Sequence, residues 1–210
     1  MNHYLAEFLT VALLHLLAVV SPGPDFVMIS RSSIVYSRKT GVYSALGLAL
    51  GILVHITYSL VGIGYIIAKS VLIFSTIKLL GAGYLVYIGI KSLKAQPAKS
   101  FEPQLVEKQN ITRLAAIRTG FLTNVLNPKV TLFFLAIFTQ VIHKDTPLAI
   151  KILYGAEMSL MTFTWFAFVS VVLSHQKIKK TFVRVQHYLE RTMGVLLIGL
   201  GIKVALSKAR

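Results

Sequence analysis

Residues 21–25 read Ser21-Pro22-Gly23-Pro24-Asp25 and lie inside the first long apolar run of the chain, Phe8 to Ser30. The two prolines lack backbone N–H donors and clash with the preceding turn, so a helix through this run is broken here. Asp25 places a carboxylate among valine, leucine, phenylalanine and isoleucine side chains, where charge is costly. Taken alone, this stretch indicates a kinked helix beside a carboxylate.

The composition indicates a membrane protein. Of the 210 residues, 55% are hydrophobic and only 14% are charged, a balance that soluble domains of this size rarely show. A bilayer core of about 30 Å needs roughly 20 apolar residues for each spanning helix. An all-α integral membrane protein with six transmembrane helices is therefore predicted from six runs of about this length: 5–30, 43–67, 70–92, 119–142, 150–173 and 186–207.

The basic residues predict how these helices are oriented. The net charge is +15, and Lys and Arg concentrate in the cytoplasmic loops of membrane proteins. With the N-terminus outside, the three inner loops carry thirteen Lys and Arg residues and the outer segments carry five. This predicts both termini outside and explains the charge by topology and contact with anionic lipids. No aromatic-basic patch accompanies the charge, so nucleic-acid binding is disfavoured.

The two halves of the chain resemble each other. Residues 93–118 form a polar linker that separates 1–92 from 119–210. Each half opens with a proline-broken helix, since Asn127-Pro128-Lys129 interrupts the fourth run, and each closes with a glycine-rich helix suited to close packing. Because three is odd, two repeats of three spans must face opposite ways, as in many secondary transporters. We therefore predict two inverted three-helix repeats joined by a cytoplasmic linker.

The two breaks together predict a site for a zwitterion. A broken membrane helix exposes half-helix ends that carry partial charges. The half-helix after Pro128, reinforced by Lys129, could hold a carboxylate, and Asp25 could hold an ammonium group or a proton. The alternative is that Pro22, Pro24 and Pro128 only kink the helices and that Asp25 pairs with Lys129. Two breaks at corresponding places, each beside a charge, favour the site.

Further polar residues lie in the apolar runs, and three of them have two interpretations each. His55 is either an interhelical hydrogen-bond partner or a proton carrier. Lys78 either extends to the membrane interface or belongs to the polar path. Glu157 either lies at the outer interface or exchanges protons deeper in the membrane. His15 is predicted to be a packed polar residue.

Four stretches of the sequence, taken in order, are similar to those of a known family. They are Ser21-Pro22-Gly23-Pro24-Asp25-Phe26, Ala45–Gly51 with His55, Lys78–Gly89 and Gly120–Lys129. Over nearly its whole length the chain resembles the LysE/RhtB family of bacterial amino-acid exporters. This resemblance implies a six-helix inner-membrane protein that expels amino acids, driven by the proton motive force. The site residues it implies are Pro22, Gly23, Pro24, Asp25, Asn127, Pro128 and Lys129, and less directly His55 and Lys78.

The predicted function is that of a secondary transporter, not an enzyme, which exports a small amino acid from the cytoplasm with proton coupling. The mixed charges in the apolar runs favour a neutral substrate, such as a threonine- or homoserine-type or other aliphatic amino acid. One alternative is export of basic amino acids or a cation. Another is an intramembrane enzyme, which would need a motif such as H-E-x-x-H or G-x-S-x-G that the sequence lacks.

No cofactor or metal is expected, because the chain has no cysteine and no close pair of acidic residues. The absence of cysteine also excludes disulfides. The expected partners are the amino-acid substrate, protons and membrane lipids. A homodimer is left open by the sequence.

Overall fold

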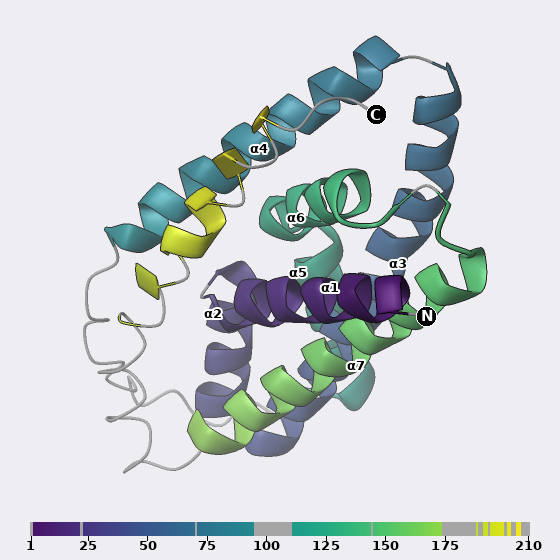
Figure 1. The fold of residues 1–210 in the computed structure, drawn as a ribbon. Coiled ribbons are helices and arrows are strands. Elements are labelled where there is room, and N and C mark those ends of the chain that lie inside the picture. Colours follow the sequence, from purple (N-terminus) through teal and green to yellow (C-terminus); the bar gives the residue numbers. More distant parts are fainter. Residues whose placement is uncertain are drawn as a thin grey trace.

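The computed structural model describes residues 2–21, 23–69, 71–94, 111–143 and 145–173, with short pieces of the last apolar run between 188 and 206 (Figure 1). Every regular element in these ranges is a helix. Pro22, the side chain of Lys78, most of the linker predicted at 93–118 and much of the run predicted at 186–207 lie outside this description.

The predicted apolar runs form helices at the expected places. The second and third runs lie in α3 (Arg38–Lys69) and α4 (Val71–Leu93), and the fifth lies in α7 (Leu148–Leu173). The first run is divided between α1 (Asn2–Val20) and α2 (Pro24–Arg31), and the fourth between α5 (Arg113–Val125) and α6 (Pro128–Gln140). α5 begins before the predicted end of the linker because the Thr112 hydroxyl accepts a hydrogen bond from the Ala115 N–H and caps the helix.

Both predicted helix breaks are present, and each lies at a proline. Pro24 opens α2 and Pro128 opens α6, at helix starts where the missing proline N–H costs little. α1 ends at Val20, and α2 continues after Arg31 into a short π-helical segment, Ser32–Tyr36. The axes of α5 and α6 are bent by 56° at their junction. The chain therefore contains two interrupted apolar segments.

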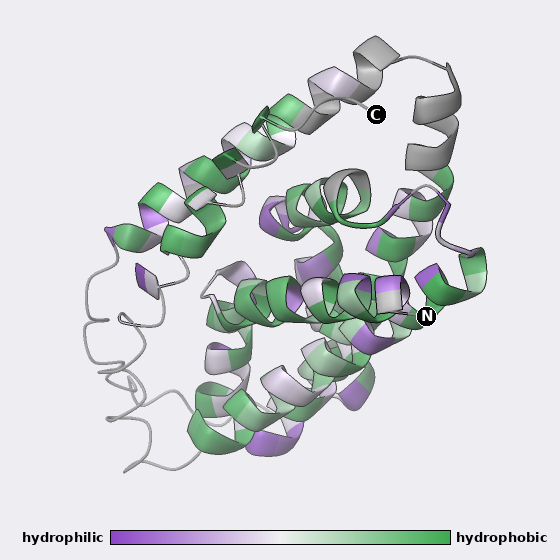
Figure 2. Ribbon diagram, viewed as in Figure 1, coloured by the Kyte–Doolittle hydropathy of each residue, from purple (hydrophilic) through white to green (hydrophobic). Residues whose placement is uncertain are grey.

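Three continuous helices of the described chain are long and apolar enough to cross a membrane, His3–Val20, Arg38–Val61 and Leu148–Leu173. The bent pair α5 and α6 adds a fourth segment if it is counted as one span. Apolar residues dominate these helices (Figure 2), and Leu5, Leu9 and Leu13 form an exposed stripe along α1 at helical spacing. Such a surface suits contact with lipid, so the fold is that of a helical membrane protein. The arrangement of six helices as inverted repeats stays a prediction.

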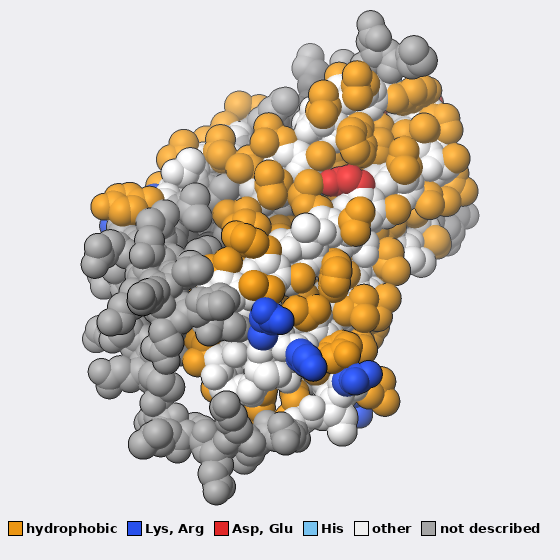
Figure 3. Space-filling view, turned by 90° about the horizontal axis from the view of Figure 1, so that it is seen from below, with side chains coloured by type: hydrophobic (Ala, Val, Ile, Leu, Met, Phe, Trp, Pro, Cys, Tyr) orange, Lys and Arg blue, Asp and Glu red, His pale blue; other side chains and the backbone are white. Residues whose placement is uncertain are grey.

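Two described helices, α3 and α5, begin at a basic end of the molecule, and α7 runs towards that end. At the basic end Arg38 begins α3 and Arg113 begins α5, and Figure 3 shows Lys and Arg side chains gathered at one border of the apolar surface. α7 runs antiparallel to α3, because Ser170 Oγ donates to the Arg38 carbonyl (3.1 Å) while Gly155 packs on Ile56. These directions agree with the order of spans predicted from the basic loops.

Glycines bring the helices into backbone contact. A Cβ on Gly120 of α5 would overlap the carbonyl oxygen of Ser44 on α3, and a Cβ on Gly47 would overlap that of Ile117. α4 meets the last apolar run in the same way, since a Cβ on Gly89 would lie 2.7 Å from the carbonyl oxygen of Gly194. Small residues at a crossing allow this approach, as the glycine-rich stretches predict.

Candidate functional site

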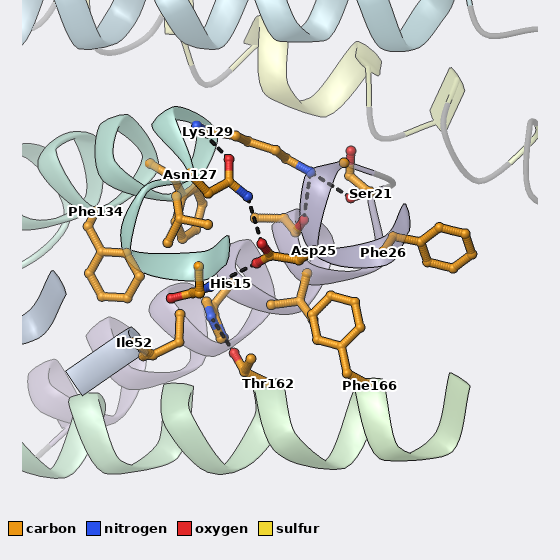
Figure 4. A pocket seen from close by; sticks show the side chains of 16 residues that line it. His15, Ser21, Asp25, Phe26, Ile52, Asn127, Lys129, Phe134, Thr162 and Phe166 are labelled. Carbon is orange, nitrogen blue, oxygen red and sulfur yellow. Dashed lines mark hydrogen bonds between the residues drawn. The ribbon is translucent and has the colours of Figure 1, made fainter. Parts of the chain in front are cut away.

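Asp25 is the centre of the candidate site (Figure 4). It lies in the first turn of α2 and is 7% exposed. Its Oδ2 accepts a hydrogen bond from Asn124 Nδ2 (2.8 Å), and its Oδ1 accepts one from Asn127 Nδ2 (2.9 Å). Both amides come from the break between α5 and α6. The carboxylate of the first broken segment is therefore held by the break in the second.

Asn127 starts α6 and orients Asp25 at the same time. Its Oδ1 accepts a hydrogen bond from the backbone N–H of Lys129 (3.0 Å), which caps the helix. Because that oxygen is the acceptor of the amide, its Nδ2 is the atom left to donate to Asp25. Asn127 is buried, and its bond to Asp25 lies away from solvent. The orientation of this amide follows from the two bonds together.

Lys129 brings a positive charge to the break in the first segment. Its Nζ donates hydrogen bonds to the carbonyl oxygens of Ser21 (2.6 Å) and Ala18 (3.1 Å), at the end of α1. The last carbonyls of a helix have no intrahelical partner, and the helix dipole favours a cation there. The lysine side chain passes beside Gly23, where a Cβ would lie 3.4 Å from Lys129 Cδ. Each break thus receives a polar group from the other.

A cavity with a volume of about 40 Å³ lies beside Asp25, enough for a few water molecules. Three buried polar atoms of its lining have no hydrogen-bond partner within the described part of the chain: His15 Nδ1, Ser21 Oγ and Asn124 Oδ1. Buried polar groups are normally paired, so these atoms are available to a bound polar molecule or water. The rest of the lining is largely apolar, including Ile52, Phe133, Phe134 and Phe166.

The structure brings together most of the residues predicted from the two breaks. Gly23, Asp25, Asn127 and Lys129 line one cavity, and Pro24 and Pro128 are the prolines that open α2 and α6. The cavity lies beside Thr162, near the middle of α7 (Figure 4). Transporter sites formed by discontinuous helices lie near the bilayer midplane. Pro22 and the side chain of Lys78 lie outside the described residues.

Glu157 lies on α7 and is half-buried, but it does not line this cavity. Its Oε2 is buried and has no hydrogen-bond partner among the described residues. The two interpretations of this carboxylate, interfacial or proton-exchanging, are both still open as predictions.

His55 also lies outside the cavity lining, although it supports a residue of the site. Its Nε2 is 3.1 Å from the carbonyl oxygen of Asn124, and its Nδ1 is 2.7 Å from the hydroxyl of Tyr58. With Nε2 donating to the carbonyl, Nδ1 accepts from the tyrosine. His55 is fully buried and stacks on Phe134, with ring centroids 5.5 Å apart. In this geometry it is an interhelical hydrogen-bond partner that holds the end of α5.

Replacing Tyr58 by phenylalanine separates the two interpretations of His55. The substitution leaves His55 Nδ1 buried without its partner, which costs about 1–3 kcal/mol. We expect a lower melting temperature in detergent and an unchanged export rate per folded molecule. Tyr87→Phe, at a side chain that is 58% exposed, is the control. An export rate that falls while the melting temperature stays the same would instead assign His55 and Tyr58 to proton transfer.

Four polar residues of the cavity were not among the predicted site residues: His15, Ser21, Asn124 and Thr162. His15 was predicted to be only packed, yet it lines the cavity and its Nε2 lies 3.4 Å from Thr162 Oγ1. Asn124 was not among the predicted site residues, although it holds Asp25. A signal existed for Asn124, because it stands in the stretch Gly120–Lys129 that also contains the predicted residues Asn127, Pro128 and Lys129. No comparable signal marked His15 or Thr162.

The fold and the site define a class: a helical membrane protein with a polar cavity between two proline-broken segments. The sequence profile of the LysE type translocator family matches residues 16–208, which is most of the chain. The chain therefore belongs to the LysE type translocator family. It is a membrane transport protein and not an enzyme.

Individual relatives cover nearly the same length. A threonine efflux protein of Salmonella typhimurium is 29% identical over 205 residues, 96% of this chain and 98% of the relative. YrhP, an uncharacterized membrane protein of Bacillus subtilis, is 30% identical over 212 residues, 98% of this chain and 100% of the relative. A homoserine/homoserine lactone efflux protein of Salmonella typhimurium is 33% identical over 144 residues, 69% of this chain and 66% of the relative. No solved structure matches the chain.

Proposed function

We propose that this protein exports a small neutral amino acid across the inner membrane of a bacterium. The observation that carries the proposal is the convergence of Asp25 and Lys129, one from each broken segment, on a single buried cavity. An amino acid carries one positive and one negative group, and intramembrane charges of opposite sign at helix breaks are suited to hold them. The names of two relatives, efflux proteins for threonine and for homoserine, support the same substrate class.

In the proposed binding mode the substrate ammonium contacts Asp25. Each carboxylate oxygen of Asp25 accepts one hydrogen bond from an asparagine, and a carboxylate has about four acceptor sites, so capacity remains. Asn124 lines the cavity, and its Oδ1, which has no hydrogen-bond partner among the described residues, would be a second acceptor. The substrate carboxylate is held by Lys129 and the break at Asn127-Pro128, with Gly23 leaving space for the lysine.

The polar side chain of the substrate would be recognised by two further polar residues that line the cavity. His15 Nδ1 and Ser21 Oγ are buried, line the cavity and have no partner within the described chain. Both can donate or accept a hydrogen bond, which suits a hydroxyl group. Threonine and homoserine are neutral amino acids with a hydroxyl group, and these are the substrates in the names of two relatives. We infer a preference for hydroxyl-bearing neutral amino acids over basic ones.

The proposal includes coupling to protons and a topology with both termini outside. Asp25 and Glu157 are the carboxylates that could exchange a proton, with His55 and Lys78 as further candidates. The basic end formed by Arg38 and Arg113 would face the cytoplasm, in keeping with the positive-inside rule. Pro22, Pro24 and Pro128 would keep the breaks in place, and assembly as a homodimer is compatible with this arrangement.

Export from proteoliposomes tests the proposal. Purified protein is reconstituted into vesicles loaded with labelled threonine, homoserine, leucine, lysine or a monovalent organic cation, and release is followed with and without an imposed pH gradient. We expect release of the hydroxyl-bearing amino acids, accelerated by the pH gradient, and little release of lysine. If lysine or the organic cation is released fastest, the protein exports basic amino acids or a cation and not a neutral amino acid. Release at the same rate with and without the pH gradient would contradict proton coupling.

A further inference from the structure

A second group of polar residues lies at the end of α1 that is remote from the cavity. His3 and Glu7 stand four residues apart on α1, so they share a face of the helix. His143 joins them from the connection between α6 and α7. One ligand atom from each of the three residues lies within 4.8 Å of those of the other two, and His3 Nε2 is 3.8 Å from Glu7 Oε2. The imidazoles of His3 and His143 meet edge to face, with centroids 4.6 Å apart.

The carboxylate of this group is buried and oriented. Glu7 is only 5% exposed, although it belongs to a helix whose outer face is apolar. Its two oxygens share the single hydroxyl hydrogen of Thr146 Oγ1, at 3.0 and 3.1 Å, and Oε2 also accepts a hydrogen bond from the backbone N–H of His143 (3.4 Å). These bonds fix the carboxylate relative to His143. The two histidines, in contrast, are exposed, so their nitrogens are accessible from outside.

We propose that His3, Glu7 and His143 form a binding site for a divalent transition metal, with Zn²⁺ as the best fit. Two imidazoles and one glutamate are a ligand set that Zn²⁺ uses at sites with a fourth position open to water. Tetrahedral coordination at about 2.0–2.2 Å places ligand atoms about 3.3–3.5 Å apart. Modest rotation of the two exposed imidazoles brings the observed atoms to that spacing, while Glu7 stays in place.

The surroundings of the carboxylate match those of a metal ligand. Ligating carboxylates are usually held by hydrogen bonds from outside the coordination sphere, and loss of such a bond typically weakens metal affinity by about 10–100-fold. Thr146 provides this bond to Glu7. The bound ion would join α1 to the α6–α7 connection, and it would stabilise the folded protein by an amount that grows with the logarithm of the free ion concentration above the Kd.

Zinc titration of the untagged protein in detergent tests the site. After removal of metal with a chelator, Zn²⁺ is added in competition with a chromophoric indicator, and the melting temperature is followed with and without the ion. We expect one Zn²⁺ per chain and a higher melting temperature. His3→Ala and His143→Ala, both at exposed side chains, are each expected to weaken binding at least about tenfold, and Thr146→Val about tenfold or more.

Two control variants are matched to these changes. His175→Ala removes a histidine outside the described residues, and Asp145→Asn neutralises an exposed carboxylate two residues from His143. Both should bind Zn²⁺ as the unsubstituted protein does. The proposal is overturned if the doubly substituted protein, His3→Ala with His143→Ala, keeps its affinity and its zinc-dependent rise in melting temperature. It is also overturned if the unsubstituted protein binds no Zn²⁺ at 100-fold excess, in which case Glu7 is held only by its hydrogen bonds to Thr146 and to the His143 N–H.

Discussion

Substituting asparagine for Asp25 is expected to reduce amino-acid export by at least about tenfold while leaving the protein folded. The substitution removes the charge that pairs with the substrate ammonium. It also replaces one carboxylate oxygen by an NH₂ group, which then faces the NH₂ donor of Asn124 or Asn127. A hydrogen bond to a charged group contributes about 1.5–3 kcal/mol, and each 1.4 kcal/mol corresponds to a factor of ten. The loss should appear in the export rate and in the apparent affinity for substrate.

The measurement compares initial export rates from proteoliposomes that contain equal amounts of folded protein. Asp145→Asn is the matched control, because it makes the same chemical change at an exposed aspartate remote from the cavity. Asp25→Glu keeps the charge but lengthens the side chain, and we expect an intermediate rate. If Asp25→Asn inserts normally and exports at the rate of the unsubstituted protein, the carboxylate does not bind substrate and the proposed site is wrong.

The two breaks could be predicted from the sequence because proline acts locally. Its missing N–H and its ring exclude a regular helix wherever it stands, so Pro24 and Pro128 mark helix starts regardless of the rest of the fold. The correspondence between the two halves led us to expect that the breaks meet. In the structure Asn127 donates a hydrogen bond to Asp25, and the binding of substrate between them stays a proposal.

The partners within the site could not be predicted, because they depend on how helices cross. Lys129 was predicted to bind a substrate carboxylate. In the structure its Nζ donates hydrogen bonds to two carbonyl oxygens at the end of α1, where the helix dipole favours a positive charge. His15 is a lone polar residue in an apolar run, and such a residue gives no periodic signal for the cavity. The group at His3 and Glu7 could not be predicted either, because its third member, His143, is far away in the chain and only the fold brings it close.

The crossing of α3 and α5 determines where Asn124 lies. Gly51 of α3 packs on the Asn124 side chain, and a Cβ on Gly51 would lie 2.6 Å from Asn124 Oδ1. One turn earlier, Gly120 packs on the backbone of α3 at Ser44. These contacts place the amide of Asn124 within 2.8 Å of Asp25. A change at the crossing should therefore reach the site even though Gly120 does not line the cavity.

Gly120→Ala is accordingly expected to destabilise the protein and to reduce export. The added methyl group would overlap the carbonyl oxygen of Ser44 and approach the backbone nitrogen of Leu48 at 3.1 Å. Overpacking typically costs about 1–3 kcal/mol when side chains can move aside, and here the opposing atoms are backbone, so α5 itself must shift. We expect a clearly lower melting temperature, a lower yield of folded protein and a lower export rate per folded molecule. Gly120→Val should be worse on all three measures.

Gly83→Ala is the matched control for this prediction, because a Cβ at that position on α4 would meet no atom of another element within 4 Å in the described part of the chain. It adds the same methyl group to a membrane helix and should leave both melting temperature and export unchanged. Alanine also favours helix formation over glycine by about 1 kcal/mol, which works against the expected loss at Gly120 and makes the test stringent. If Gly120→Ala melts and exports like Gly83→Ala, the two helices do not approach as closely as described. In that case the position of Asn124 beside Asp25 would need another cause.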